Sequence, residues 1–121
     1  METNNPISIK MVRGVAHVQF LNKFYRDDKD IATLQSQLRA ILPRKDCGKI
    51  VLDFDGVEYV SSQFMGILIA FKKDATRNGT FVCTCAMDDD VVQQFAVPLD
   101  EGECLFSFED TFDKAYEFLT R

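Results

Sequence analysis

A strand–helix–strand pattern in the middle of the chain constrains the fold more than any other feature. The segment "KIVLDF", residues 49–54, is apolar at nearly every position and predicts a central strand covered on both faces. Apolar residues then recur at helical spacing from Phe64 to Ala75, ahead of "RNG", where Gly79 can cap a helix. The segment "TFVCTCA" predicts the next strand. A helix that connects two such strands implies that they are parallel.

The flanking segments extend this pattern to a layered α/β domain. "ISIKM" and "VAHVQF" alternate like the strands of a hairpin, and "YRDDKD" precedes an amphipathic helix that Pro43 ends. Towards the C-terminus, "DDDVVQQF" predicts a short helix, "CLFSF" a short last strand and residues 112–119 a final helix. We therefore predict one α/β domain over residues 1–121, with a mixed sheet that a β-hairpin opens and parallel strands continue, and with helices as crossovers.

Charge and hydropathy exclude several classes of partner. The formal net charge is -5, and the 14 Lys and Arg residues are scattered, whereas a nucleic-acid binder needs a concentrated positive surface. The longest apolar stretch, Phe64 to Phe71, is far shorter than the roughly 20 residues that cross a bilayer. The N-terminal residues do not resemble a signal peptide. We predict a cytoplasmic protein with no nucleic-acid partner and no membrane association.

The cysteines and the histidine do not indicate a metal or a cofactor. Cys47, Cys83, Cys85 and Cys104 form no C-x-x-C pair, and no histidine stands near them at metal-ligand spacing. Cys83 and Cys85 are two apart in a predicted strand, so both are expected to face the same side as small buried hydrophobic residues. His17 is the only histidine and is predicted to be a half-exposed strand residue, not a catalytic base.

The segment "VLDFDG" resembles the nucleophile loop of haloacid-dehalogenase-type phosphatases. That resemblance implies that Asp53 attacks a phosphoryl group, that Asp55 is the general acid and base, and that Mg²⁺ neutralises the oxygens. Such enzymes also need a lysine and an acidic pair at later strand ends, whereas Lys72 and Lys73 fall inside a predicted helix. We favour the simpler interpretation, in which Asp53 ends a strand and Asp55-Gly56 forms a turn.

The longer segment "LDFDGVEYVSSQFMGILIAFKKDATRNGTFVCTCA" resembles the core of STAS domains, in particular the stand-alone anti-sigma factor antagonists. Those proteins carry an apolar strand, a loop of the form V-x-(F/Y)-(I/V)-(D/S)-S, a helix written G-L-G-x-L, and a second strand after a G-G turn. The residues that match are Val57, Tyr59, Val60, Ser61 and Ser62 in the loop, Met65, Gly66 and Leu68 in the helix, and Gly79 in the turn.

This resemblance implies a regulator and not an enzyme. The unmodified protein would bind an anti-sigma factor with serine kinase activity, the kinase would phosphorylate Ser62 and end the binding, and a PP2C-type phosphatase would restore it. The predicted partner-binding residues around Ser62 are Ser61, Gln63, Phe64, Met65 and Gly66.

Two features of the loop leave alternatives open. Ser61 stands where the family often has an acidic residue, and Phe64 stands where it has a small glycine. Ser62 could also be an unmodified serine that caps the helix, because serine is among the preferred N-cap residues. The chain would then be a constitutive STAS interaction module without phosphorylation.

Overall fold

The computed structural model describes residues 6–43, 48–95 and 108–120. In chain order the elements are β1 (Ile7–Val12), β2 (Val15–Phe20), β3 (Phe24–Tyr25), α1 (Asp28–Ile41), β4 (Lys49–Asp53), β5 (Tyr59–Val60), α2 (Ser62–Arg77), β6 (Phe81–Cys85), α3 (Asp89–Phe95), β7 (Phe108–Glu109) and α4 (Phe112–Thr120).

The main sheet has the mixed topology that the sequence predicts. Its strand order is β1-β2-β4-β6-β7. β1 and β2 form an antiparallel hairpin, whereas β2, β4, β6 and β7 are parallel to one another. The predicted strand "CLFSF" appears as β7 only from Phe108 onwards, because residues 104–107 lie outside the described residues.

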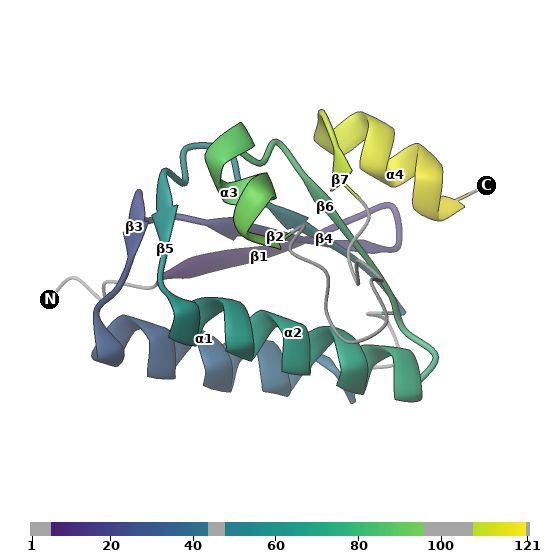
Figure 1. The fold of residues 1–121 in the computed structure, drawn as a ribbon. Helices are drawn as coiled ribbons and strands as arrows, with labels where there is room; N and C mark the ends of the chain where they lie inside the picture. The colour runs from purple at the N-terminus through teal and green to yellow at the C-terminus, as the bar shows by residue number, and fades with distance from the viewer. Residues whose placement is uncertain (1–5, 44–47, 96–107, 121) are drawn as a thin grey trace, which may run out of the picture.

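Helices cover both faces of this sheet (Figure 1). α1 and α2 run side by side along one face, and α4 lies on the other face over β4, β6 and β7. The residues of β4 divide accordingly, since Ile50 and Leu52 join the larger core under α1 and α2, whereas Val51 joins the smaller core under α4. Cys83 and Cys85 are both fully buried in that smaller core, which confirms that they face the same side.

The inward face of α2 follows the predicted helical spacing. Phe64, Leu68, Phe71 and Ala75 are all buried against the sheet. The helix ends at Arg77, and Gly79 has a φ of +75°, the left-handed conformation expected of a residue that follows a helix. This stripe fixes α2 along the sheet and thereby places its first residue, Ser62, at the end where the parallel strands have their carboxyl ends.

Candidate functional site

Each of the two long helices begins directly after one strand of a small two-stranded parallel sheet. β3 pairs with β5 so that Phe24 lies opposite Tyr59 and Tyr25 lies opposite Val60. The Ser61 N–H donates to the Tyr25 carbonyl oxygen at 2.9 Å. Asp27 then caps α1 and Ser61 caps α2. The two N-termini therefore lie next to each other at the carboxyl end of the parallel strands, the usual place for sites in such sheets (Figure 1).

The two adjacent serines have different roles. Ser61 has an extended backbone, and its Oγ accepts a hydrogen bond from the Phe64 N–H at 3.1 Å, so Ser61 is the N-cap of α2. Ser62 is the first residue of the helix, and its side chain is exposed. No hydrogen bond joins the Ser62 hydroxyl to another residue in the described part of the chain. Because Ser61 already caps the helix, the Ser62 hydroxyl is not needed for that role.

This division of roles predicts different costs for two matched substitutions. Ser61→Ala removes the cap and is expected to lower the free energy of unfolding by about 1 kcal/mol. Ser62→Ala removes only an exposed hydroxyl, so its effect is expected to stay within about 0.5 kcal/mol. Urea denaturation of both variants beside the wild type measures the difference. Equal losses in the two variants would mean that Ser62 shares the capping role.

Phe64 requires a correction to the predicted partner-binding residues. Its side chain has 0% of its surface exposed and packs among the rings of Phe20, Tyr25 and Phe54, at centroid distances of 5.5, 4.8 and 6.3 Å. A buried ring cannot contact a partner, so Phe64 fastens the first turn of α2 to the core instead. Gln63 and Gly66 are exposed, and Ser61 and Met65 are partly buried. Contact between these four residues and a partner stays a prediction.

Asp53 and His17 form a pair that the sequence does not predict. Asp53 ends β4 as expected, and its Oδ2 lies 2.7 Å from Nε2 of His17 in β2. Its Oδ1 accepts a hydrogen bond from the Asp55 N–H at 3.0 Å. The His17 ring also packs on Phe112 of α4, with 4.0 Å between centroids. The pair therefore joins two strands of the sheet to the helix that covers them and fixes the turn that follows β4.

This geometry gives no support to the phosphatase hypothesis. The Asp53 side chain is only 10% exposed, and each of its oxygens already has a hydrogen-bond partner, whereas a nucleophile needs an oxygen directed at the substrate. Lys72 and Lys73 lie within α2, as the sequence predicts. Asp55 is exposed in the turn, and Gly56 beside it has a φ of +88°. The two aspartates are a strand end and a turn residue.

The Asp53 pair predicts a graded effect on stability. Asp53→Ala leaves the Asp55 N–H and the His17 ring without their acceptor, so it is expected to cost roughly 1 to 3 kcal/mol. Asp53→Asn is expected to cost less, because an amide can accept one of these hydrogen bonds and donate in the other. Asp55→Asn, at an exposed turn, is the control and is expected to be nearly neutral. Thermal melts measure the series. Magnesium-dependent hydrolysis of a phosphate ester that disappears in Asp53→Asn would contradict this assignment.

The buried thiols are not suited to nucleophilic chemistry. Burial raises the pKa of Cys83 to about 11, and the charge of Glu109 adds to that shift. Burial also raises the pKa of Cys85, and the carboxylate of Asp53 raises it further. Both thiols are therefore protonated at neutral pH. Cys47 and Cys104 lie outside the described residues.

Residues 6–43, 48–95 and 108–120 hold neither a metal-binding cluster nor a membrane-spanning helix. Within them, no group of three or more His, Cys, Asp and Glu side chains is placed to hold a metal ion. No helix among those residues is long and apolar enough to cross a membrane.

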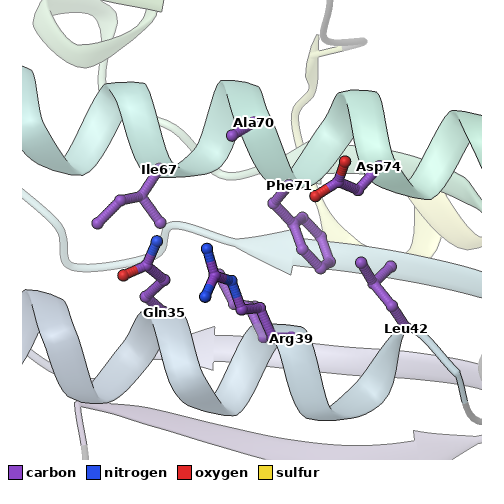
Figure 2. Close-up of a pocket in the computed structure, with 8 residues that line it drawn as sticks. Gln35, Arg39, Leu42, Ile67, Ala70, Phe71 and Asp74 are labelled. Atoms are coloured by element: carbon purple, nitrogen blue, oxygen red, sulfur yellow. The ribbon is translucent and has the colours of Figure 1, made fainter.

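A shallow hollow also lies along the outer seam between α1 and α2 (Figure 2). Gln35 and Arg39 reach into it from α1, and Ile67, Phe71 and Asp74 border it from α2. Leu38 of α1 and Phe71 of α2 line the hollow and are also buried in the larger core, where they help to pack the two helices together. The hollow is thus a feature of helix packing, and it lies along the helices and not at their N-termini.

The STAS domain family model matches residues 27–115, a range that includes both long helices, β5 and the serine pair. The chain belongs to the STAS domain family. Its fold agrees with the family's arrangement of a hairpin, parallel strands and helices on both faces. A comparison with curated proteins found no match.

Solved structures similar to this STAS domain include several anti-sigma factor antagonists. An antagonist-type STAS protein from Planctomyces limnophilus has a TM-score of 0.80 at 17% identity, covering 97% of this chain and 99% of its own. A putative anti-sigma factor antagonist from Thermotoga maritima has a TM-score of 0.77 at 20% identity, covering 95% of both chains. The Bacillus cell fate determinant SpoIIAA in its phosphorylated form has a TM-score of 0.73 at 10% identity, covering 95% of this chain and 99% of its own. At these identities the likeness shows the fold.

Proposed function

We propose that this STAS domain is an anti-sigma factor antagonist that phosphorylation of Ser62 switches off. The observation that carries the proposal is the exposed Ser62 hydroxyl at the first position of α2, next to a second serine that already caps the helix. The similar structures support it, because they include anti-sigma factor antagonists and one of these, SpoIIAA, has been solved in both an unphosphorylated and a phosphorylated form.

The position of Ser62 suits a phosphate group. A phosphoserine carries about -1.5 to -2 charges at neutral pH, and the N-terminus of a helix stabilises an anion through its unpaired N–H groups and its dipole. The first turn of α2 contains no acidic residue that would repel the phosphate. The helix has 16 residues, so its dipole is well developed. The domain can therefore carry the phosphate without unfolding.

The same phosphate would end partner binding. In the unmodified state the Ser62 side chain is small and neutral, and Gln63 and Gly66 beside it are exposed. An anti-sigma factor can therefore pack closely against this surface. An anti-sigma factor with serine kinase activity would transfer the γ-phosphoryl group of ATP to the Ser62 oxygen; the bond from the γ-phosphorus to the bridging oxygen would break, ADP would leave, and the hydroxyl proton would pass to solvent. The new dianion would then lie in the interface without a counterion, and its desolvation would release the partner. A PP2C-type phosphatase would hydrolyse the ester and restore binding.

Mapping the phosphate in the protein isolated from its source cells tests this proposal. Mass spectrometry of proteolytic fragments is expected to find phosphate on Ser62 and none on Ser61, because the Ser61 oxygen is engaged in the cap. In a Ser62→Ala variant expressed in the same cells, the phosphorylated fraction should disappear. Phosphate on Ser61 alone, or a phosphate that persists in Ser62→Ala, would contradict the assignment.

A further inference from the structure

Two aromatic rings are exposed on the small sheet that leads into α2. Phe24 is 46% exposed and Tyr59 is 42% exposed. They lie opposite each other in the β3–β5 register, whereas the next pair, Tyr25 and Val60, is buried. The small sheet thus has one face in the core and one face that presents two neighbouring rings to solvent. Exposed aromatic pairs are uncommon on surfaces without partners, because they leave a large apolar area in water.

An arginine completes this face. The Arg26 guanidinium carbon lies 5.0 Å from the centre of the Phe24 ring, within the range of a cation–π contact. Asp27 and Asp28 follow directly in the sequence, yet no ion pair joins Arg26 to them or to any other residue that the structure describes. Arg26 is therefore held over the ring, and its hydrogen-bond donors are directed at no carboxylate in residues 6–43, 48–95 and 108–120. We call Phe24, Arg26 and Tyr59 the aromatic ledge.

The aromatic ledge is continuous with the serine turn, by which we mean residues 61–66, the N-cap and first turn of α2. Tyr59 comes three residues before Ser62 in the chain, and the Ser61 N–H is bonded to the Tyr25 carbonyl, between Phe24 and Arg26. The Tyr59 N–H is bonded in turn to the Lys23 carbonyl. These backbone bonds fix the ledge relative to the start of α2. A partner that covers Ser62 therefore meets a pre-organised surface and orders little of it on binding.

The serine turn alone offers little binding energy. Phe64 is buried, Met65 is partly buried, and the exposed residues of the turn are Ser62, Gln63 and Gly66, which provide few apolar contacts. Interfaces gain most of their affinity from a few aromatic and arginine residues near their centre. The ledge supplies these residue types beside the turn.

We infer that the aromatic ledge is the anchoring half of the surface that binds the anti-sigma factor, an inference that rests on the proposed function. The partner contributes an apolar side chain that packs on the Phe24 and Tyr59 rings, together with a carboxylate that pairs with Arg26. The ledge provides affinity in both states of the switch, and the charge on Ser62 determines whether that affinity is sufficient. Recognition and regulation are thereby carried by adjacent but different residues.

Site-specific photo-crosslinking in the source cells tests this inference. The photoreactive residue benzoylphenylalanine is placed in turn at Phe24, Tyr59, Gln63 and Phe81, and the adducts are identified by mass spectrometry. Phe81 is the matched control, because it is 63% exposed but follows the far end of α2, whose 16 residues span roughly 24 Å. We expect Phe24, Tyr59 and Gln63 to capture the same anti-sigma factor and Phe81 not to capture it.

The possible failures can be told apart. If Gln63 captures an anti-sigma factor and the two ledge positions do not, the ledge inference is wrong and the proposed function stands. If the ledge positions capture a second copy of this chain or an unrelated protein, the inference is also wrong. If no position captures an anti-sigma factor, the proposed function fails together with it.

Affinity measurements with the captured and then purified anti-sigma factor give the second test. The double variant Phe24→Ser, Tyr59→Ser is expected to bind at least about tenfold more weakly, and Arg26→Ala several-fold more weakly. Phe81→Ser should bind like the wild type. Because all of these side chains are exposed, far-ultraviolet circular dichroism should show that every variant is folded. Unchanged affinity in the folded double variant would overturn the inference.

Discussion

Ser62→Asp is expected to leave the domain folded and to weaken its binding to the anti-sigma factor by between about 30-fold and 1,000-fold. The carboxylate lies at the positive end of α2, where an anion is tolerated, so the fold is preserved. In the complex the same charge is desolvated without a counterion, at a cost of roughly 2 to 4 kcal/mol. Ser62→Ala is expected to bind like the unmodified protein and to be insensitive to kinase and ATP.

Ser62→Asn is the matched control for this prediction. Asparagine has nearly the shape of aspartate and carries no charge, so the difference between the two variants isolates the electrostatic contribution. We expect Ser62→Asn to lose much less affinity than Ser62→Asp. Equal losses would show that the site senses size and not charge. Equal affinity of the wild type, Ser62→Ala and Ser62→Asp would leave a constitutive STAS binding module.

Phe64→Ala is expected to lower the free energy of unfolding by roughly 3 to 5 kcal/mol, the range for emptying a buried aromatic site. The ring has no exposed surface, and its removal leaves a cavity among Phe20, Tyr25 and Phe54. It also frees the first turn of α2 from the core. Chemical denaturation followed by circular dichroism measures the loss.

The neighbouring exposed residue provides the comparison for Phe64. Gln63→Ala changes a solvent-exposed side chain on the same turn and is expected to shift stability by less than about 0.5 kcal/mol. If Phe64→Ala instead kept wild-type stability and lost only partner binding, the ring would be an interface residue, as the sequence suggested, and its assignment to the core would be wrong.

The main sheet and the long helices could be predicted because their patterns repeat. The uniformly apolar "KIVLDF" indicates a strand with two covered faces, and the observed division of Ile50 and Val51 between two cores is the physical reason for that pattern. Phe64, Leu68, Phe71 and Ala75 indicate one buried face of α2, as the structure confirms. The position of Ser62 at the start of α2 follows from the same periodicity.

The small sheet, the His17–Asp53 pair and the packing of Phe64 depend on contacts between distant residues, which no local sequence pattern indicates. β3 and β5 have two residues each, too few for an alternation to be visible, and so the aromatic ledge could not be predicted. His17 and Asp53 are 36 residues apart and meet only because β2 and β4 are neighbours in the sheet. Phe64 could be assigned to the core by its helical spacing or to the surface by its place in the loop motif, and only its packing decided between these assignments.

The claim that phosphorylation of Ser62 controls partner binding is tested by measuring the affinity of the anti-sigma factor for two forms of the same chain. One form is unmodified, and the other carries phosphoserine incorporated at position 62 during synthesis, so that no kinase is needed. Isothermal titration calorimetry in the absence of ATP compares them. We predict tight binding by the unmodified protein and a loss of at least about 30-fold on phosphorylation, with both forms equally folded. Equal affinity of the two forms would contradict the claim that phosphorylation of Ser62 controls this protein.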